Sequence, residues 1–150
     1  SRTLGLDVGE RRIGIAVADE LGMIASPVGV VLRGEGDLRR IIETATTHGA
    51  GLVVIGLPTG LSGREGPQAA TVRAFAETLA VASGDALEIE FWDERLTSTM
   101  AERALDAKGR KKNRRSGEID AMAAAFILQG YLDKNFGPDK TGPKPEPANE

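Results

Sequence analysis

The run Leu52-Val53-Val54-Ile55 limits the possible folds of this chain more than any other segment. Four successive apolar residues lack the alternation of a strand with one face in water, and they are typical of a short strand covered on both faces. Such a strand needs helices on each side of its sheet. Two stretches can supply them, because residues 69–79 carry apolar side chains at helical spacing and residues 121–128 are apolar nearly all round.

The other expected elements follow one another within a single domain, residues 1–135. The expected strands are 4–8, 13–18, 28–32, 52–55 and 87–92, and the expected helices are 37–48, 67–79, 97–107 and 116–132, with Asp37 and Ser116 as N-caps of the first and last. This order predicts an α/β fold with a mixed five-stranded sheet and helices on both faces. Residues 136–150 are polar and rich in proline, and we expect them to form a disordered tail.

Composition narrows the chemistry that the chain can perform. It contains no cysteine and only one histidine, His48, which excludes disulfides, thiolate catalysis and histidine-clustered metal sites within one chain. Oxygen ligands remain, and these favour magnesium, manganese or calcium. No apolar run approaches the roughly 20 residues of a membrane span, and the N-terminus lacks a signal-peptide pattern. We therefore expect a cytoplasmic protein with no membrane partner.

Three acidic residues adjoin apolar segments and form the candidate catalytic and metal site. Asp7 lies in the first expected strand, Glu94 follows the fifth, and Asp120 lies in the first turn of the last helix. Burying a lone carboxylate costs several kcal/mol, and two carboxylates about 5 Å apart repel by roughly 3 kcal/mol at an effective dielectric near 20. A divalent cation would reverse that repulsion. Glu94 is preferred to Asp93 because only one of the two can face the side of Asp7, and glutamate has the longer reach.

Each acid also has a structural interpretation that the sequence leaves open. Asp7, two residues before Gly9, could close a hairpin turn through its own backbone. Glu94 could belong to a solvated loop, with Arg95 as a local ion-pair partner. Asp120 could serve only to complement the positive end of the helix macrodipole.

The formal net charge of −3 conceals a strongly basic segment. Six of the 19 lysine and arginine residues fall within residues 108–115, immediately before the last helix. Such a segment is either a solvated loop or a surface that grips phosphates. The candidate nucleic-acid-binding residues are Arg11, Arg12, Arg95, Lys108, Arg110, Lys111, Lys112, Arg114 and Arg115. The glycine-rich residues 56–66 match neither a Walker A motif nor a dinucleotide fingerprint, although their glycines would allow close approach of a substrate.

Five motifs in this order resemble the YqgF/RuvX family of Holliday-junction-resolvase-like nucleases. They are Leu4-Gly5-Leu6-Asp7-Val8-Gly9 with Arg12-Ile13-Gly14, Val54-Ile55-Gly56-Leu57-Pro58, Glu65-Gly66-Pro67-Gln68-Ala69, Asp93-Glu94-Arg95-Leu96-Thr97, and Ile119-Asp120 before Ala123-Ala124. The resemblance covers residues 3–133. It implies a ribonuclease H-like fold, a divalent-metal nuclease that matures the 5′ end of 16S ribosomal RNA precursor and also acts on branched DNA, and an acidic triad at Asp7, Glu94 and Asp120. Thr59-Gly60-Leu61 departs from the family's commoner sequence.

The expected mechanism is hydrolysis of phosphodiester bonds assisted by two Mg²⁺ or Mn²⁺ ions that Asp7 bridges. Two other functions remain open. The Asp-x-Gly at the end of the first strand also occurs in actin-like sugar kinases and chaperone ATPases, which bind ATP between two such domains. The chain could also be a noncatalytic RNA-binding or ribosome-assembly module. The sequence leaves the choice between monomer and homodimer open.

Overall fold

The computed structural model describes residues 2–59, 63–94 and 116–136 of the chain. The strands are β1 (Arg2–Val8), β2 (Arg12–Ala18), β3 (Ala25–Leu32), β4 (Ala50–Leu57) and β5 (Glu88–Asp93), and the helices are α1 (Asp37–Thr47), α2 (Pro67–Ala82) and α4 (Ser116–Phe136). The expected helix at 97–107 and residues 137–150 of the expected tail lie outside the described residues, whereas Phe136, the first residue of that expected tail, is the last residue of α4. Among the described residues, no helix has the length and apolar character needed to cross a membrane.

The five strands form one mixed sheet in the order β3-β2-β1-β4-β5. β1 pairs with β2 and β2 with β3 in antiparallel fashion, whereas β4 pairs in parallel with both β1 and β5. The mixed five-stranded sheet predicted from the sequence is therefore confirmed. The carboxyl ends of β1, β4 and β5 meet at one edge, which is where such sheets place their functional groups.

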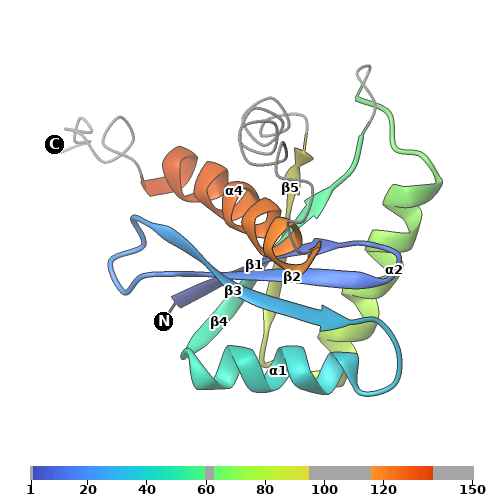
Figure 1. Cartoon of the computed structure of the whole chain (residues 1–150), viewed down its shortest axis with the longest axis horizontal. Coiled ribbons are helices and arrows are strands. Elements are labelled where there is room, and N and C mark those ends of the chain that lie inside the picture. The colour runs from blue at the N-terminus through green and yellow to red at the C-terminus, as the bar shows by residue number, and fades with distance from the viewer. Residues whose placement is uncertain (1, 60–62, 95–115, 137–150) are drawn as a thin grey trace, which may run out of the picture.

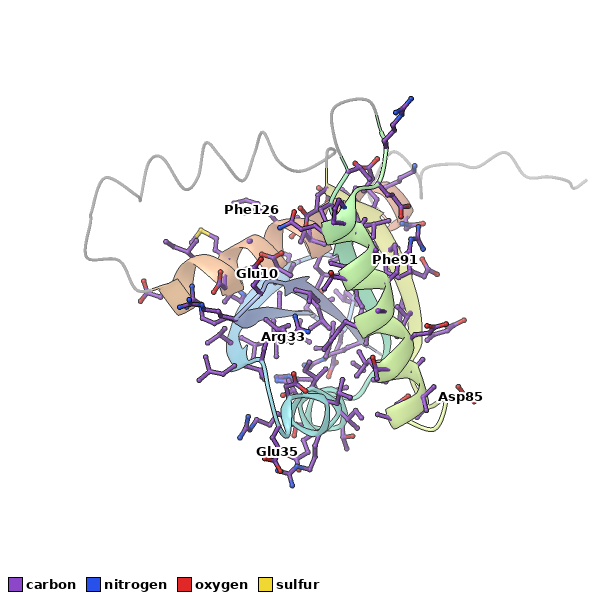
Figure 2. The ribbon with its side chains drawn as sticks, turned by 90° about the vertical axis from the view of Figure 1, so that its right-hand side faces the viewer. Glu10, Arg33, Glu35, Asp85, Phe91 and Phe126 are labelled. Carbon is purple, nitrogen blue, oxygen red and sulfur yellow. The ribbon has the colours of Figure 1, made fainter. Side chains whose placement is uncertain are left out.

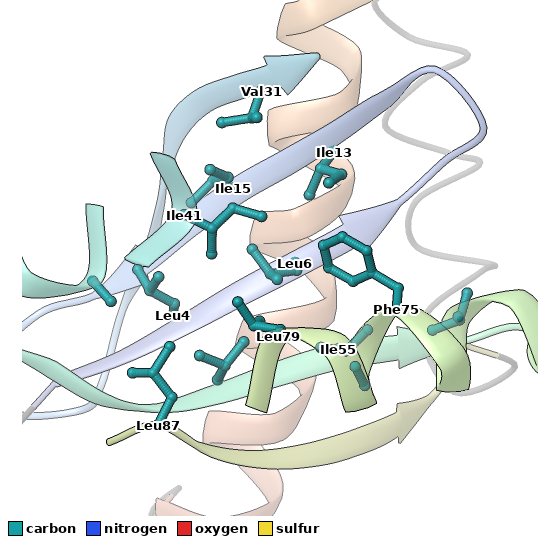
Figure 3. Packing of buried hydrophobic residues seen from close by; sticks show 14 of the residues in the cluster. Leu4, Leu6, Ile13, Ile15, Val31, Ile41, Ile55, Phe75, Leu79 and Leu87 are labelled. Atoms are coloured by element: carbon teal, nitrogen blue, oxygen red, sulfur yellow. The ribbon is translucent and has the colours of Figure 1, made fainter. Parts of the chain in front are cut away.

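Helices cover both faces of this sheet, as predicted from the run at 52–55 (Figure 1). Val53 and Ile55 of β4 face α1 and α2, while Val54 faces α4, so the apolar run is divided between two cores. Figure 3 shows the first core, in which Leu6 and Ile55 pack near Leu79 of α2. The second core is smaller and is filled largely by α4 against β2, β4 and β5. It includes Trp92, whose ring meets that of Tyr131 edge-on at 6.3 Å between centroids.

Two glycines bring α4 unusually close to the sheet. A Cβ placed on Gly5 of β1 would lie 2.7 Å from Leu128 Cβ, and one on Gly14 of β2 would collide with the backbone of Asp120. A side chain at either position would force the helix away. These glycines therefore fix the distance at which Asp120 is held above the strands.

Some predicted element ends were wrong. Asp37 is the first residue of α1 rather than its N-cap, because Gly36 occupies the cap position with a left-handed φ of 86°. The Asp37 carboxylate instead accepts a hydrogen bond from the Gly34 N–H at 3.0 Å. β3 starts at Ala25, three residues before the expected position, because pairing with β2 continues through a bulge around Val28. The predicted stop of α1 near Gly49 is confirmed, since Gly49 has a left-handed φ of 66°.

Candidate active site

Asp7 lies near the end of β1, on the face of the sheet that α4 covers. It pairs with Gly14 across the β1–β2 hairpin, and strand alternation places its side chain on the same face as Gly5, which contacts α4. The pKa of the Asp7 carboxyl is raised from 3.8 to about 7, mainly by burial and in addition by the nearby charges of Glu94 and Asp120. A carboxylate in this position is therefore unfavourable unless a cation accompanies it.

Glu94 follows β5 directly and reaches back over β4. A Cβ placed on Gly56 would lie 2.7 Å from Glu94 Oε2, so the carboxylate occupies the space that the glycine leaves free. Burial, and secondly the charge of Asp93, raise the pKa of the Glu94 carboxyl above its ordinary value. Asp93 Oδ1 accepts a hydrogen bond from Thr59 Oγ1 at 2.7 Å. The structure thus assigns the two adjacent acids different surroundings and places Glu94 on the side of Asp7.

Asp120 lies in the second turn of α4, above β2. Its backbone rests against Gly14, and its Oδ2 accepts a hydrogen bond from Arg12 Nε at 2.6 Å. Arg12 and Asp120 are 108 positions apart in the chain, so this ion pair joins the two ends of the domain. The candidate nucleic-acid ligand Arg12 is therefore engaged with one of the candidate metal ligands.

The three acids are close enough to interact but do not surround a common point. The charges of Glu94 and Asp120 both act on Asp7. Within residues 2–59, 63–94 and 116–136, however, no group of three histidine, cysteine or acidic side chains is arranged to hold a metal ion. The three acids lie on one face of the sheet, and their role as metal ligands stays a prediction.

A pocket of ≈ 210 Å³ lies beside Asp7 and Glu94 and adds residues that the sequence did not single out. One wall comes from the ends of β1 and β4, and the opposite wall comes from the first turns of α2, with Gln68, Thr71 and Val72. Glu10 also lines it and, in Figure 2, projects near the sheet edge between α4 and α2. Glu10 and Gln68 each lie within or beside a quoted motif, so adjacency to those motifs was the available signal.

The hairpin turn beside Asp7 is closed by the backbone. The Gly9 N–H donates to the Arg12 carbonyl at 2.8 Å, and Arg33 Nη1 donates to the Gly9 carbonyl at 2.8 Å. The Arg33 guanidinium in turn stacks 5.1 Å from the centre of the Phe75 ring. These contacts close and brace the turn through groups other than the Asp7 carboxylate, which weakens the interpretation of Asp7 as a turn residue.

The segment after β4 is tied to α2 and β5. Thr59 and Glu65 form an isolated antiparallel bridge, and Glu65 accepts two hydrogen bonds from Arg73 at 2.8 and 2.6 Å. The Arg73 guanidinium lies 4.8 Å from the ring centre of Phe91, which Figure 2 shows beside α2. This connection, together with the bond from Thr59 to Asp93, orders the wall of the pocket that Pro58 contributes.

The candidate basic residues fall into two groups. Arg11 is exposed in the turn between β1 and β2, at the same end of the sheet as Asp7, and Arg12 pairs with Asp120. The other candidates lie outside the described residues; they are Arg95, Lys108, Arg110, Lys111, Lys112, Arg114 and Arg115. Among the candidates that the structure describes, Arg11 is thus exposed near the acids and Arg12 is partly exposed.

The acidic side chains suit a hard divalent cation. All three offer carboxylate oxygens, the ligands that Mg²⁺ and Mn²⁺ prefer. The pKa of Asp7 is raised first by burial and then by the negative charges of Glu94 and Asp120, and a bound cation would offset both effects. The residues present thus fit a divalent-metal centre.

Solved structures with this architecture define the fold class. The chain matches T. thermophilus RuvC in complex with Holliday junction substrate at a TM-score of 0.57 and 18% identity, over 91% of this chain and 96% of that one. It also matches the fowlpox virus resolvase in complex with Holliday junction DNA at a TM-score of 0.53 and 8% identity, over 91% and 99%. At these identities the likeness establishes the fold alone, the ribonuclease H-like α/β fold of RuvC-like resolvases.

Residues 1–134 match the family described as "RuvX: Holliday junction resolvase". Two relatives, both named "Putative pre-16S rRNA nuclease", support the match. The protein of Symbiobacterium thermophilum is 49% identical over 131 residues, 86% of this chain and 90% of that protein. The protein of Myxococcus xanthus is 44% identical over 140 residues, 92% and 91% of the two chains. The chain belongs to the RuvX family, which confirms the resemblance found in its sequence.

Proposed function

We propose that this protein is a divalent-metal-dependent nuclease that hydrolyses phosphodiester bonds, with the 5′ end of precursor 16S ribosomal RNA as its principal substrate and branched DNA as a second. The names of the relatives and of the family support the two substrates. The observation that carries the proposal is the convergence of Asp7, Glu94 and Asp120 on one face of the sheet, with the pKa of Asp7 raised to about 7. Carboxylates crowded in this way favour a bound cation.

In this proposal Asp7, Glu94 and Asp120 would hold two Mg²⁺ or Mn²⁺ ions. Bound ions would supply a water of lowered pKa and would stabilise the negative charge on the leaving oxygen. The protein provides the rigid frame, since β1, β5 and α4 each position one carboxylate. The pocket beside Asp7 and Glu94 has room for part of a nucleotide, and Gln68 and Thr71 offer polar groups on its far wall.

The exposed arginine at the β1–β2 turn and the basic residues 108–115 serve in this proposal to bind phosphates. Contacts of this kind place the backbone of a nucleic acid without reading its sequence. They would act equally on a structured RNA and on a DNA junction. Selection between the two substrates must then depend on the shape of the nucleic acid or on the number of active sites in the assembled protein. A junction that is cut symmetrically needs two active sites, and therefore two copies of the chain.

The test is a cleavage assay with Mn²⁺ on precursor 16S RNA, single-stranded RNA, single-stranded DNA and a four-way junction. We expect cleavage by the parent, its loss with EDTA and its loss in Asp7→Asn, whose fold is checked by circular dichroism. Equal cleavage by parent and Asp7→Asn would contradict the proposal. Binding of RNA unaffected by EDTA, with no substrate cut, would favour the noncatalytic module, and ATP binding without cleavage would favour the actin-like alternative. The mass in solution with bound junction decides between monomer and dimer.

A further inference from the structure

The ion pair between Arg12 and Asp120 joins a basic residue to a proposed metal ligand. Arg12 Nε lies 2.6 Å from Asp120 Oδ2, and the two side chains are 37% and 25% exposed. Arg12 lies two positions before Gly14 in β2, so strand alternation places it on the face that α4 covers, as it does Asp7. The Arg12 guanidinium therefore provides a positive charge beside Asp120 on this face of the sheet.

The backbone of Asp120 has little freedom to move. Gly14 lies directly beneath it, and Gly5 lets the turns of α4 around Ala124 and Leu128 also lie close to β1. A change in the position of the Asp120 carboxylate must then come from rotation of its side chain. While Arg12 holds Oδ2, the described residues contain no three-acid group arranged for a metal. A metal ion that bound Oδ2 would compete with the Arg12 guanidinium for the same oxygen.

We infer that Arg12 is a positioning residue that keeps Asp120 out of the ion-binding set until a phosphate of the nucleic acid takes its guanidinium. The inference rests on the proposed function. Arginine suits this exchange because its planar fork of five N–H donors binds a phosphate in bidentate fashion, and because its charge is independent of pH in the physiological range. The more-than-one-third exposure of Arg12 leaves the guanidinium open to a phosphate from solvent.

This arrangement makes binding of metal and binding of nucleic acid cooperative. A phosphate that occupies Arg12 frees Asp120, and an ion that occupies Asp120 frees Arg12. Because such coupling is reciprocal, each ligand must raise the affinity for the other by the same factor. The protein would thus assemble its complete ion site mainly on nucleic acid, and would hold fewer ions when free.

The test measures Mn²⁺ affinity by electron paramagnetic resonance and calorimetry, without reference to cleavage. In the absence of nucleic acid we expect Arg12→Gln to bind Mn²⁺ about 5-fold more tightly than Arg11→Gln. This factor corresponds to about 1 kcal/mol, the upper end of the free energies typical of exposed ion pairs. Arg11→Gln removes the same charge from the neighbouring exposed position, so it corrects for the general rise in negative potential. Arg12→Lys keeps a cation beside Asp120 and should lie close to the parent.

A saturating single-stranded DNA oligonucleotide, checked on a gel to remain intact, completes the test. It should tighten Mn²⁺ binding by the parent about 5-fold and leave the affinity of Arg12→Gln nearly unchanged. Thermal unfolding verifies that each variant is folded. Equal Mn²⁺ affinity of Arg12→Gln and Arg11→Gln, with clear binding by the parent, would overturn the inference and leave the proposed function standing. A parent that binds no Mn²⁺, with or without the oligonucleotide, would overturn both.

Discussion

Replacing Asp7 by asparagine should stabilise the metal-free protein, and more so at high pH. The pKa of the Asp7 carboxyl rises from 3.8 to about 7 on folding, so the folded state binds the proton more tightly than the unfolded chain. Stability is therefore lost as pH rises between these two values. At 1.36 kcal/mol per pKa unit, the raised pKa of Asp7 costs the fold about 2 kcal/mol at pH 5, where the folded carboxyl is protonated, and about 4 kcal/mol at pH 8, where it is ionised.

Urea unfolding in EDTA at pH 5 and pH 8 measures this effect. Any cost of the substitution that does not depend on pH cancels between the two pH values. This cost should also be small, because asparagine resembles a protonated aspartic acid in shape. The free energy of unfolding of Asp7→Asn relative to the parent should then rise by about 2–3 kcal/mol from pH 5 to pH 8. A difference that is the same at both pH values would refute the reasoning, because it would mean that Asp7 experiences neither burial nor crowding by the other acids.

Asp19 provides a control of opposite sign. Its carboxylate accepts hydrogen bonds from the Met23 and Ile24 N–H groups at 2.7 and 3.1 Å, and these bonds lower its pKa. A lowered pKa contributes stability that is present above the unfolded-state value and is lost as pH falls through the folded-state value. Asp19→Asn should therefore reduce stability at pH 8, where Asp7→Asn increases it.

Three further predictions concern the helix, the acids and the basic segment. Gly14→Ala should destabilise the fold by about 1–3 kcal/mol through its collision with the backbone of Asp120, whereas Gly29→Ala, with no neighbouring atom within 4 Å of the new Cβ, should change the urea midpoint little. Glu94→Gln and Asp120→Asn should each abolish Mn²⁺-dependent cleavage while circular dichroism stays unchanged; full activity in either would remove that residue from the site. If residues 108–115 neutralise about six phosphates of a duplex, log Kd against log salt should have a slope of magnitude near 5, and an unchanged slope after neutralising the segment would exclude it from the interface.

The sequence was sufficient to predict the sheet because the relevant signals are local. An apolar run such as 52–55 and a glycine after a helix act within a few residues, and the mixed five-stranded sheet, the α1 stop and the family are confirmed. The choice of Glu94 over Asp93 used strand alternation, another local rule, and the structure places Glu94 on the side of Asp7. Whether Asp7, Glu94 and Asp120 bind metal stays a prediction.

The remaining features depend on contacts between distant segments. The pairing of Arg12 with Asp120 requires knowledge of how far α4 lies from β2, and that distance is set by Gly14, a residue with no side chain to signal its role. Gln68 and Thr71 line the pocket only because α2 crosses the sheet beside the end of β1. The N-cap of α1 was predicted wrongly because Asp37 and Gly36 are both acceptable caps, and the hydrogen bond from Gly34 decides between them.

The most direct test of the metal centre is a crystal structure of the parent protein with Mn²⁺ and a bound oligonucleotide, analysed by anomalous scattering at the manganese edge. We predict manganese peaks at about 2.0–2.3 Å from carboxylate oxygens of Asp7, Glu94 and Asp120, with Arg12 released from Asp120. Manganese bound elsewhere, with these three carboxylates apart and Asp120 still held by Arg12, would contradict the account.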